Sequence, residues 1–138
     1  MAEVLILDAE ALSVLAHATA RAVSAQRARA ILTIAHEMRA PVRVPAAVLA
    51  EVCRGGARDA AIDRVLTGRG IGVVDLNARI ARRAGALLAA AKLDSAHAVD
   101  AFVVATAAEL GPSVIATHDP DDIGKLAAGD PKIRVWAI

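Results

Sequence analysis

Four acidic residues lie in apolar parts of the sequence, where a carboxylate is not expected for solvation alone. Asp8 directly follows the run VLIL, and Asp119 lies just beyond the run SVIAT. Glu51 and Asp100 each lie in a mainly apolar segment of helical character, and the segment around Asp100 reads HAVDAFVVATAAEL. A buried carboxylate is costly unless a hydrogen-bond network, a shifted pKa or a metal ion compensates its charge.

These four residues predict a site for a divalent cation. If the strands that precede Asp8 and Asp119 are neighbours in a parallel sheet, both acids face one crevice beyond the carboxyl ends of the strands. With Glu51 and Asp100 they would form a cluster that repels itself, and a hard divalent ion with oxygen ligands relieves that repulsion. A ligand set made only of oxygen favours Mg²⁺ or Mn²⁺ over zinc.

Short apolar strands that alternate with helical segments must position these acids. The pattern predicts strands at Val4–Leu7, Val42–Val44, Val73–Leu76, Ser113–Thr117 and Ile133–Ile138. It predicts helices at about Ala9–His17, Ser24–Met38, from Pro45 to Gly55, and at Arg58–Leu66, Ala78–Lys92, His97–Leu110 (with Asp94 or Ser95 as N-cap) and Asp122–Ala127. This alternation predicts an α/β fold in which helix layers cover both faces of a mainly parallel, five-stranded sheet.

Length and composition indicate one soluble domain that spans residues 1–138. The chain is 57% hydrophobic and 22% charged, which is enough apolar material for one core. Charged residues interrupt the apolar runs before a membrane span is reached, and the acidic start lacks the basic region of a signal peptide. We therefore expect a cytoplasmic protein without a membrane partner. The single cysteine, Cys53, excludes an internal disulfide and a cysteine-built zinc site.

Charge is unevenly distributed, although the formal net charge is only +1. Residues 21–92 carry thirteen basic and five acidic side chains, whereas residues 93–138 carry three basic and seven acidic ones. Solvated helix faces would explain this distribution. A basic rim around an acidic centre would explain it equally well, and such a rim suits an enzyme that acts on a polyanion with metal ions.

Four segments occur in an order that resembles a known family. LILDAEALS ends the first strand, VPAAVLAEVCRGG follows the second, and VDAFVVATA and IATHDPDDI come in the second half of the chain. Together they resemble the PIN-domain ribonucleases, most of all the small single-domain toxins of VapBC toxin–antitoxin systems. The resemblance covers essentially the whole chain and implies a PIN-like three-layer α/β/α sandwich.

The resemblance also implies which residues form the site. It makes Asp8, Glu51, Asp100 and Asp119 the catalytic, metal-binding acids and Thr117 the hydroxyl beside them. The fourth ligand stays open at this point, because two further acids follow Asp119 closely, and a glutamate stands where many relatives have Ser or Asn. These additional candidates are Asp121, Asp122 and Glu10.

The implied activity is Mg²⁺- or Mn²⁺-dependent hydrolysis of RNA phosphodiester bonds, with one or two metal ions. Arginines within residues 21–92 would bind substrate phosphates. With Phe102 and Trp136 as the only aromatic residues, base stacking cannot dominate recognition. The resemblance further implies a VapB-like antitoxin as partner, and the Ala-rich helices make a homodimer plausible.

Two alternatives remain at this point. A phosphoacceptor receiver domain also gathers acids and Mg²⁺ at strand ends, with Asp75 as its acceptor and Thr117 as its switch hydroxyl. It would need a lysine at the carboxyl end of the last strand, whereas Lys132 lies at the other end. The second alternative is a PIN-fold module that binds RNA or protein without cutting.

Overall fold

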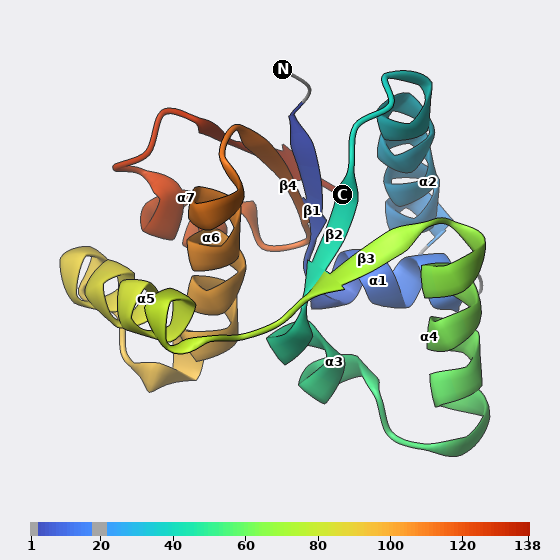
Figure 1. The fold of residues 1–138 in the computed structure, drawn as a ribbon, viewed down its shortest axis with the longest axis horizontal. Helices are drawn as coiled ribbons and strands as arrows, with labels where there is room; N and C mark the ends of the chain where they lie inside the picture. The colour runs from blue at the N-terminus through green and yellow to red at the C-terminus, as the bar shows by residue number, and fades with distance from the viewer. Residues whose placement is uncertain (1–2, 18–21) are drawn as a thin grey trace.

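A sheet of five parallel strands forms the centre of the molecule (Figure 1). The computed structural model describes residues 3–17 and 22–138. The strands lie in the order β3-β2-β1-β4-β5. Their bounds are β1 Val4–Leu7, β2 Val42–Pro45, β3 Ile71–Val74, β4 Ser113–Thr117 and β5 Ile133–Ala137. The predicted sheet is confirmed, and all of its pairings are parallel.

Helices cover both faces of this sheet, so the predicted three-layer sandwich is confirmed. Their bounds are α1 Ala9–Ala16, α2 Ala22–Glu37, α3 Ala46–Val52, α4 Gly56–Gly68, α5 Ala78–Ala91, α6 Ala98–Leu110 and α7 Pro120–Ala127, with a 3-10 turn η1 at Ser95–His97. Helices α5, α6 and α7 pack together on one face, whereas α1 contacts α2 and α4 on the other (Figure 1). Helix α3 contacts both α1 and α6.

The central strands and α6 form the core. Leu5, Ile6 and Leu7 of β1 are at most 3% exposed, because β2 and β4 flank this strand and helices cover it on both sides. Helix α6 is buried around most of its circumference and contacts β1, β2 and β4. This packing explains why its sequence is apolar on nearly every side. It also places the first turn of α6, which carries Asp100, near the carboxyl ends of these strands.

The third strand is the element that the sequence misplaced. We expected Val73–Leu76, and the strand is Ile71–Val74, two residues earlier. Pairing with β2 decides the register, since Val42 faces Ile71 and Pro45 faces Val74. Because β3 is an edge strand, Val73 is 41% exposed, and apolar character alone does not mark its bounds.

Helix starts also differ from the predictions by one or two residues, for local reasons. Helix α7 begins at Pro120 instead of Asp122, because Asp119 caps it and proline suits the first helical position. Pro45 ends β2 and caps α3 instead of lying in its first turn. Helix α4 begins at Gly56, where Asp59 accepts hydrogen bonds from the preceding backbone amides. No helix in the described ranges is long and apolar enough to cross a membrane.

Candidate metal centre

Asp8 lies where β1 passes into α1, and the protein holds its carboxylate in place. Asp8 is the N-cap of α1, and its Oδ1 accepts a hydrogen bond from the Ala11 amide at 2.8 Å. Burial raises the pKa of Asp8 above its ordinary value, although hydrogen bonds from the Thr117 hydroxyl and from the amides of Ala11 and His118 lower it in part. The hydrogen bonds therefore compensate the negative charge of the buried Asp8 carboxylate only in part.

Thr117 connects Asp8 to the loop after β4. Strands β1 and β4 are neighbours, and Thr117 at the end of β4 is fully buried. Its hydroxyl donates to Asp8, and its Oγ1 accepts a hydrogen bond from the Asp119 amide at 2.9 Å. One side chain therefore fixes the ends of two strands and the backbone that leads to Asp119.

Asp100 lies at the centre of a group of acids. The pKa of Asp100 is raised to about 6, first by burial and then by the negative charges of Asp119, Asp8, Glu51 and Asp122. These residues come from five different parts of the chain: the ends of β1 and β4, and helices α3, α6 and α7. We call these five residues the acidic cluster.

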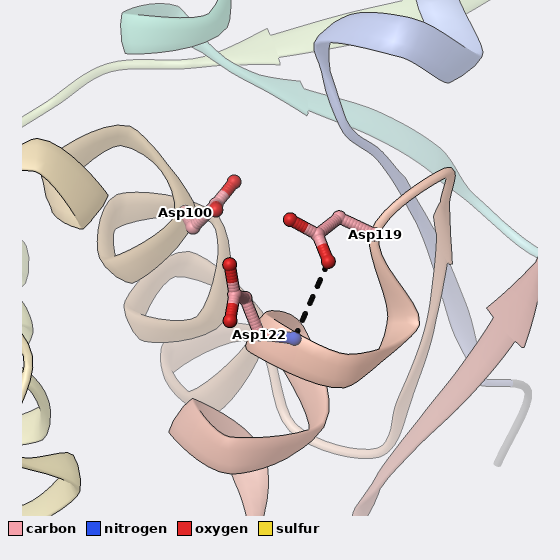
Figure 2. A group of neighbouring side chains, drawn as sticks. All are labelled: Asp100, Asp119 and Asp122. Carbon is pink, nitrogen blue, oxygen red and sulfur yellow. Dashed lines mark hydrogen bonds between the residues drawn. The ribbon is translucent and has the colours of Figure 1, made fainter.

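Three members of the acidic cluster have their carboxylates closest together, and we call them the aspartate triad: Asp100, Asp119 and Asp122. One oxygen from each lies within 4.8 Å of the others (Figure 2). Asp119 Oδ1 accepts a hydrogen bond from the Asp122 amide at 3.4 Å, so the start of α7 places both residues opposite α6. Three carboxylates at this spacing, all oxygen donors, fit a hard divalent cation such as Mg²⁺ or Mn²⁺.

The structure separates the additional acids that the sequence left open. The negative charge of Asp122 contributes to the raised pKa of Asp100. Asp121 is exposed and is not among the acids that raise this pKa. Glu10 lies near Asp8, whose pKa its charge raises. The signal for Asp122 was present in the sequence: Asp119 as N-cap and Pro120 after it put Asp122 in the first turn of α7.

The basic segment, residues 21–92, contributes two guanidinium groups that contact carbonyls at the carboxyl end of α3. Arg54 donates to the carbonyls of Ala50 and Cys53, and Arg58 donates to the carbonyl of Val52. Both side chains therefore lie at the carboxyl end of α3, the helix that carries Glu51. Two other arginines of the basic segment, Arg79 and Arg83, form ion pairs with Glu109 on α6. Arg21 lies outside the described residues.

Comparison with protein families matches residues 5–128 to the PIN domain. This chain belongs to the PIN-domain family. The match spans all five acids of the acidic cluster, so the proposed site lies within the PIN domain itself. A search of curated proteins gave no match.

Solved structures share the PIN fold of this chain. One is VapBC2 from Rickettsia felis bound to a DNA fragment from their promoter, with a TM-score of 0.70, 14% identity and 98% coverage of both chains. Another is a toxin–antitoxin complex from Klebsiella pneumoniae, with a TM-score of 0.62, 23% identity, and coverage of 97% of this chain and 99% of that chain. At these identities the likeness establishes the fold.

Membership of the PIN family removes the support for a receiver domain. Asp75 is exposed, and it follows edge strand β3 instead of lying within it. Strand β2 separates β3 from β1, and the acids that act on Asp100 do not include Asp75. The acids that gather around Asp100 therefore remain the candidate site of this PIN domain.

Proposed function

We propose that this PIN domain is a metal-dependent ribonuclease and the toxin of a VapBC-type toxin–antitoxin pair. One observation carries the proposal: Asp100 lies among four other acids, and its burial together with their negative charges raises its pKa to about 6. A protein that gathers so much negative charge without a cation destabilises itself, so a bound divalent ion is the physical reason for the arrangement.

Residues of the acidic cluster would hold the metal. The aspartate triad offers one carboxylate oxygen each within 4.8 Å. Asp8 and Glu51 complete the set, Asp8 in a fixed orientation and Glu51 exposed on α3, where it is free of the buried hydrogen bonds that hold Asp8. When bound, Mg²⁺ or Mn²⁺ supplies a water of lowered pKa and positive charge for the scissile phosphate.

The remaining roles follow from charge and exposure. Glu51, at the accessible side of the acidic cluster, orients the attacking water. Arg54 and Arg58 lie at the end of the same helix, and the planar guanidinium group suits phosphate oxygens. Because Phe102 and Trp136 are the only aromatic residues, the substrate is recognised through backbone charge and shape.

Cleavage of structured RNA tests the activity. The wild-type chain is incubated with RNA in Mg²⁺ or Mn²⁺ and with a chelator, beside Asp100→Asn and the control Asp63→Asn, an exposed acid on α4. We expect metal-dependent cleavage in the wild type and the control and its loss in Asp100→Asn. Circular dichroism verifies folding. Cleavage by folded Asp100→Asn would contradict the assigned site, and no cleavage by any form would favour a module that does not cut.

The proposed partners are a small antitoxin encoded beside the gene and a second copy of the chain, in the cytoplasm where the RNA substrate is made. The relatives of known structure are toxin–antitoxin assemblies. Large apolar side chains that the described fold leaves exposed, such as Met38 and Trp136, support contact with another protein. Light scattering of the chain, alone and with the product of the neighbouring gene, tests both partners. A monomer that binds nothing would refute them.

A further inference from the structure

We propose that His97 is a positioning residue that holds Asp122 in the aspartate triad and so sets the metal affinity of the site. This inference rests on the proposed function, because it concerns the same site. His97 ends the turn η1 and is the N-cap residue of α6, one turn before Asp100. It makes no capping hydrogen bond with its side chain, so the ring is available for another contact.

The ring of His97 reaches across to α7. Its Nε2 lies 3.4 Å from Asp122 Oδ2, and its Nδ1 lies 3.7 Å from Asp94 Oδ1. Asp94 is the N-cap of η1 and is fixed by its hydrogen bond with the Ala96 amide. His97 thus lies between two carboxylates and connects the start of α6 to the first turn of α7.

Asp122 needs such a contact, because its nearest neighbours on the other side are acids. Without a cation Asp100 and Asp119 repel the Asp122 carboxylate, and the hydrogen bond from the Asp122 amide to Asp119 fixes its backbone but not its side chain. Lys125 also contacts Asp122, with 3.9 Å between Nζ and Oδ1, but its side chain is 62% exposed and lies on the same helix. Such exposed pairs restrain geometry weakly.

His97 is better suited than Lys125 to fix the position of Asp122. The His97 side chain is only 30% exposed and comes from a different element than Asp122. It also has fewer rotatable bonds than a lysine side chain. The ring contacts Oδ2 of Asp122, and a carboxylate has a second oxygen that can bind a metal. Groups that orient metal ligands in this way typically change metal affinity about 10- to 100-fold when they are removed.

Manganese binding to the full chain, measured by titration calorimetry without RNA, tests the role of His97. The glutamine amide reaches the position of Nε2 and the asparagine amide does not, so His97→Gln and His97→Asn form a matched pair beside His97→Ala. His36→Ala serves as the control, because the His36 ring contacts the Arg69 carbonyl and lies on α2. Circular dichroism establishes that each variant is folded.

We expect His97→Ala and His97→Asn to weaken Mn²⁺ binding about 10- to 100-fold. His97→Gln should stay within about threefold of the wild type, and His36→Ala should be unchanged. Unchanged or tighter binding in folded His97→Ala, or equal losses in the Asn and Gln variants, would overturn the positioning role while the proposed function stands. Absence of Mn²⁺ binding by the wild type would overturn both.

Discussion

At the scale of single residues, the negative charges of buried Asp8 and half-buried Asp100 are poorly compensated, for different reasons. Desolvation is the largest cause of the raised pKa of both Asp8 and Asp100. Asp8 recovers part of that loss through hydrogen bonds, whereas four further acids raise the pKa of Asp100 to about 6. The sequence predicted Asp100 as a site residue because its carboxylate stands in an apolar helical segment. It could not identify the contact of His97 with Asp122, since that contact depends on where α7 lies.

The raised pKa of Asp100 predicts how pH affects the stability of the metal-free protein. A carboxyl group whose pKa is raised from 3.8 to about 6 by folding stabilises the folded state below the lower value, and this stability is lost as pH rises through the higher one. The free energy of unfolding should therefore fall between about pH 4 and pH 7. At pH 7.5 Asp100→Asn should be more stable by about 1–2 kcal/mol, less than the full shift implies because the side chain is partly exposed.

Urea unfolding at a series of pH values in the presence of a chelator measures this effect. The curves of the wild type and Asp100→Asn should converge near pH 4 and separate as pH rises. Parallel curves across the whole range would contradict the cause assigned to the raised pKa. Marked destabilisation of Asp100→Asn at neutral pH would instead indicate that Asp100 has a structural hydrogen-bonding role.

At the scale of elements, the site depends on β1 and β4 being neighbours. The sequence predicted the bounds of both strands correctly, since each is an apolar run in a sheet interior that helices cover. It misplaced β3, where one face is open and pairing with β2 sets the register. It could not fix the order of the strands, on which the meeting of Asp8 with Thr117 depends. Element types were therefore predictable from local patterns, whereas their adjacency required the tertiary structure.

The Thr117 hydroxyl connects the ends of β1 and β4, and its removal tests how much this connection stabilises the fold. Thr117→Val keeps the shape of the side chain but removes the hydroxyl that donates to Asp8 and accepts from the Asp119 amide. We expect the free energy of unfolding to fall by about 1–3 kcal/mol, because a buried polar network loses its central member. Thr117→Ser keeps the hydroxyl, so its free energy of unfolding should fall by less than half of the decrease in Thr117→Val. Equal stability of the Val variant and the wild type in urea would show that the hydroxyl has no such role.

At the scale of the whole molecule, opposite charges are separated along the chain. The basic segment carries thirteen Lys and Arg residues, and the acidic cluster draws its members from both ends of the sequence as well as from α3. Figure 1 shows that α4 and α5, which belong to the basic segment, lie on opposite sides of the sheet. If the proposed RNA substrate binds by its backbone, the basic side chains of these two helices are candidates for contacts with its phosphates.

Salt dependence tests whether RNA binds by its backbone. Fluorescence anisotropy with folded Asp100→Asn, which should bind without cutting, measures affinity for RNA at different salt concentrations. For about three phosphate contacts, raising the salt from about 50 to about 200 mM should weaken binding at least roughly tenfold. Arg54→Ala should reduce this salt dependence. Binding that does not respond to salt would indicate recognition by base contacts instead.

The hydrogen bond from the Ala11 amide to Asp8 connects the first turn of helix α1 to the candidate site. The same carboxylate that would hold a cation also closes the first turn of this helix. An ion that draws electron density from Asp8 weakens that closure, whereas an empty, fully ionised site strengthens it. If the site binds an ion as proposed, the opening of this helix turn would be thermodynamically linked to the binding, and the exchange rate of the Ala11 amide would report whether the site is occupied.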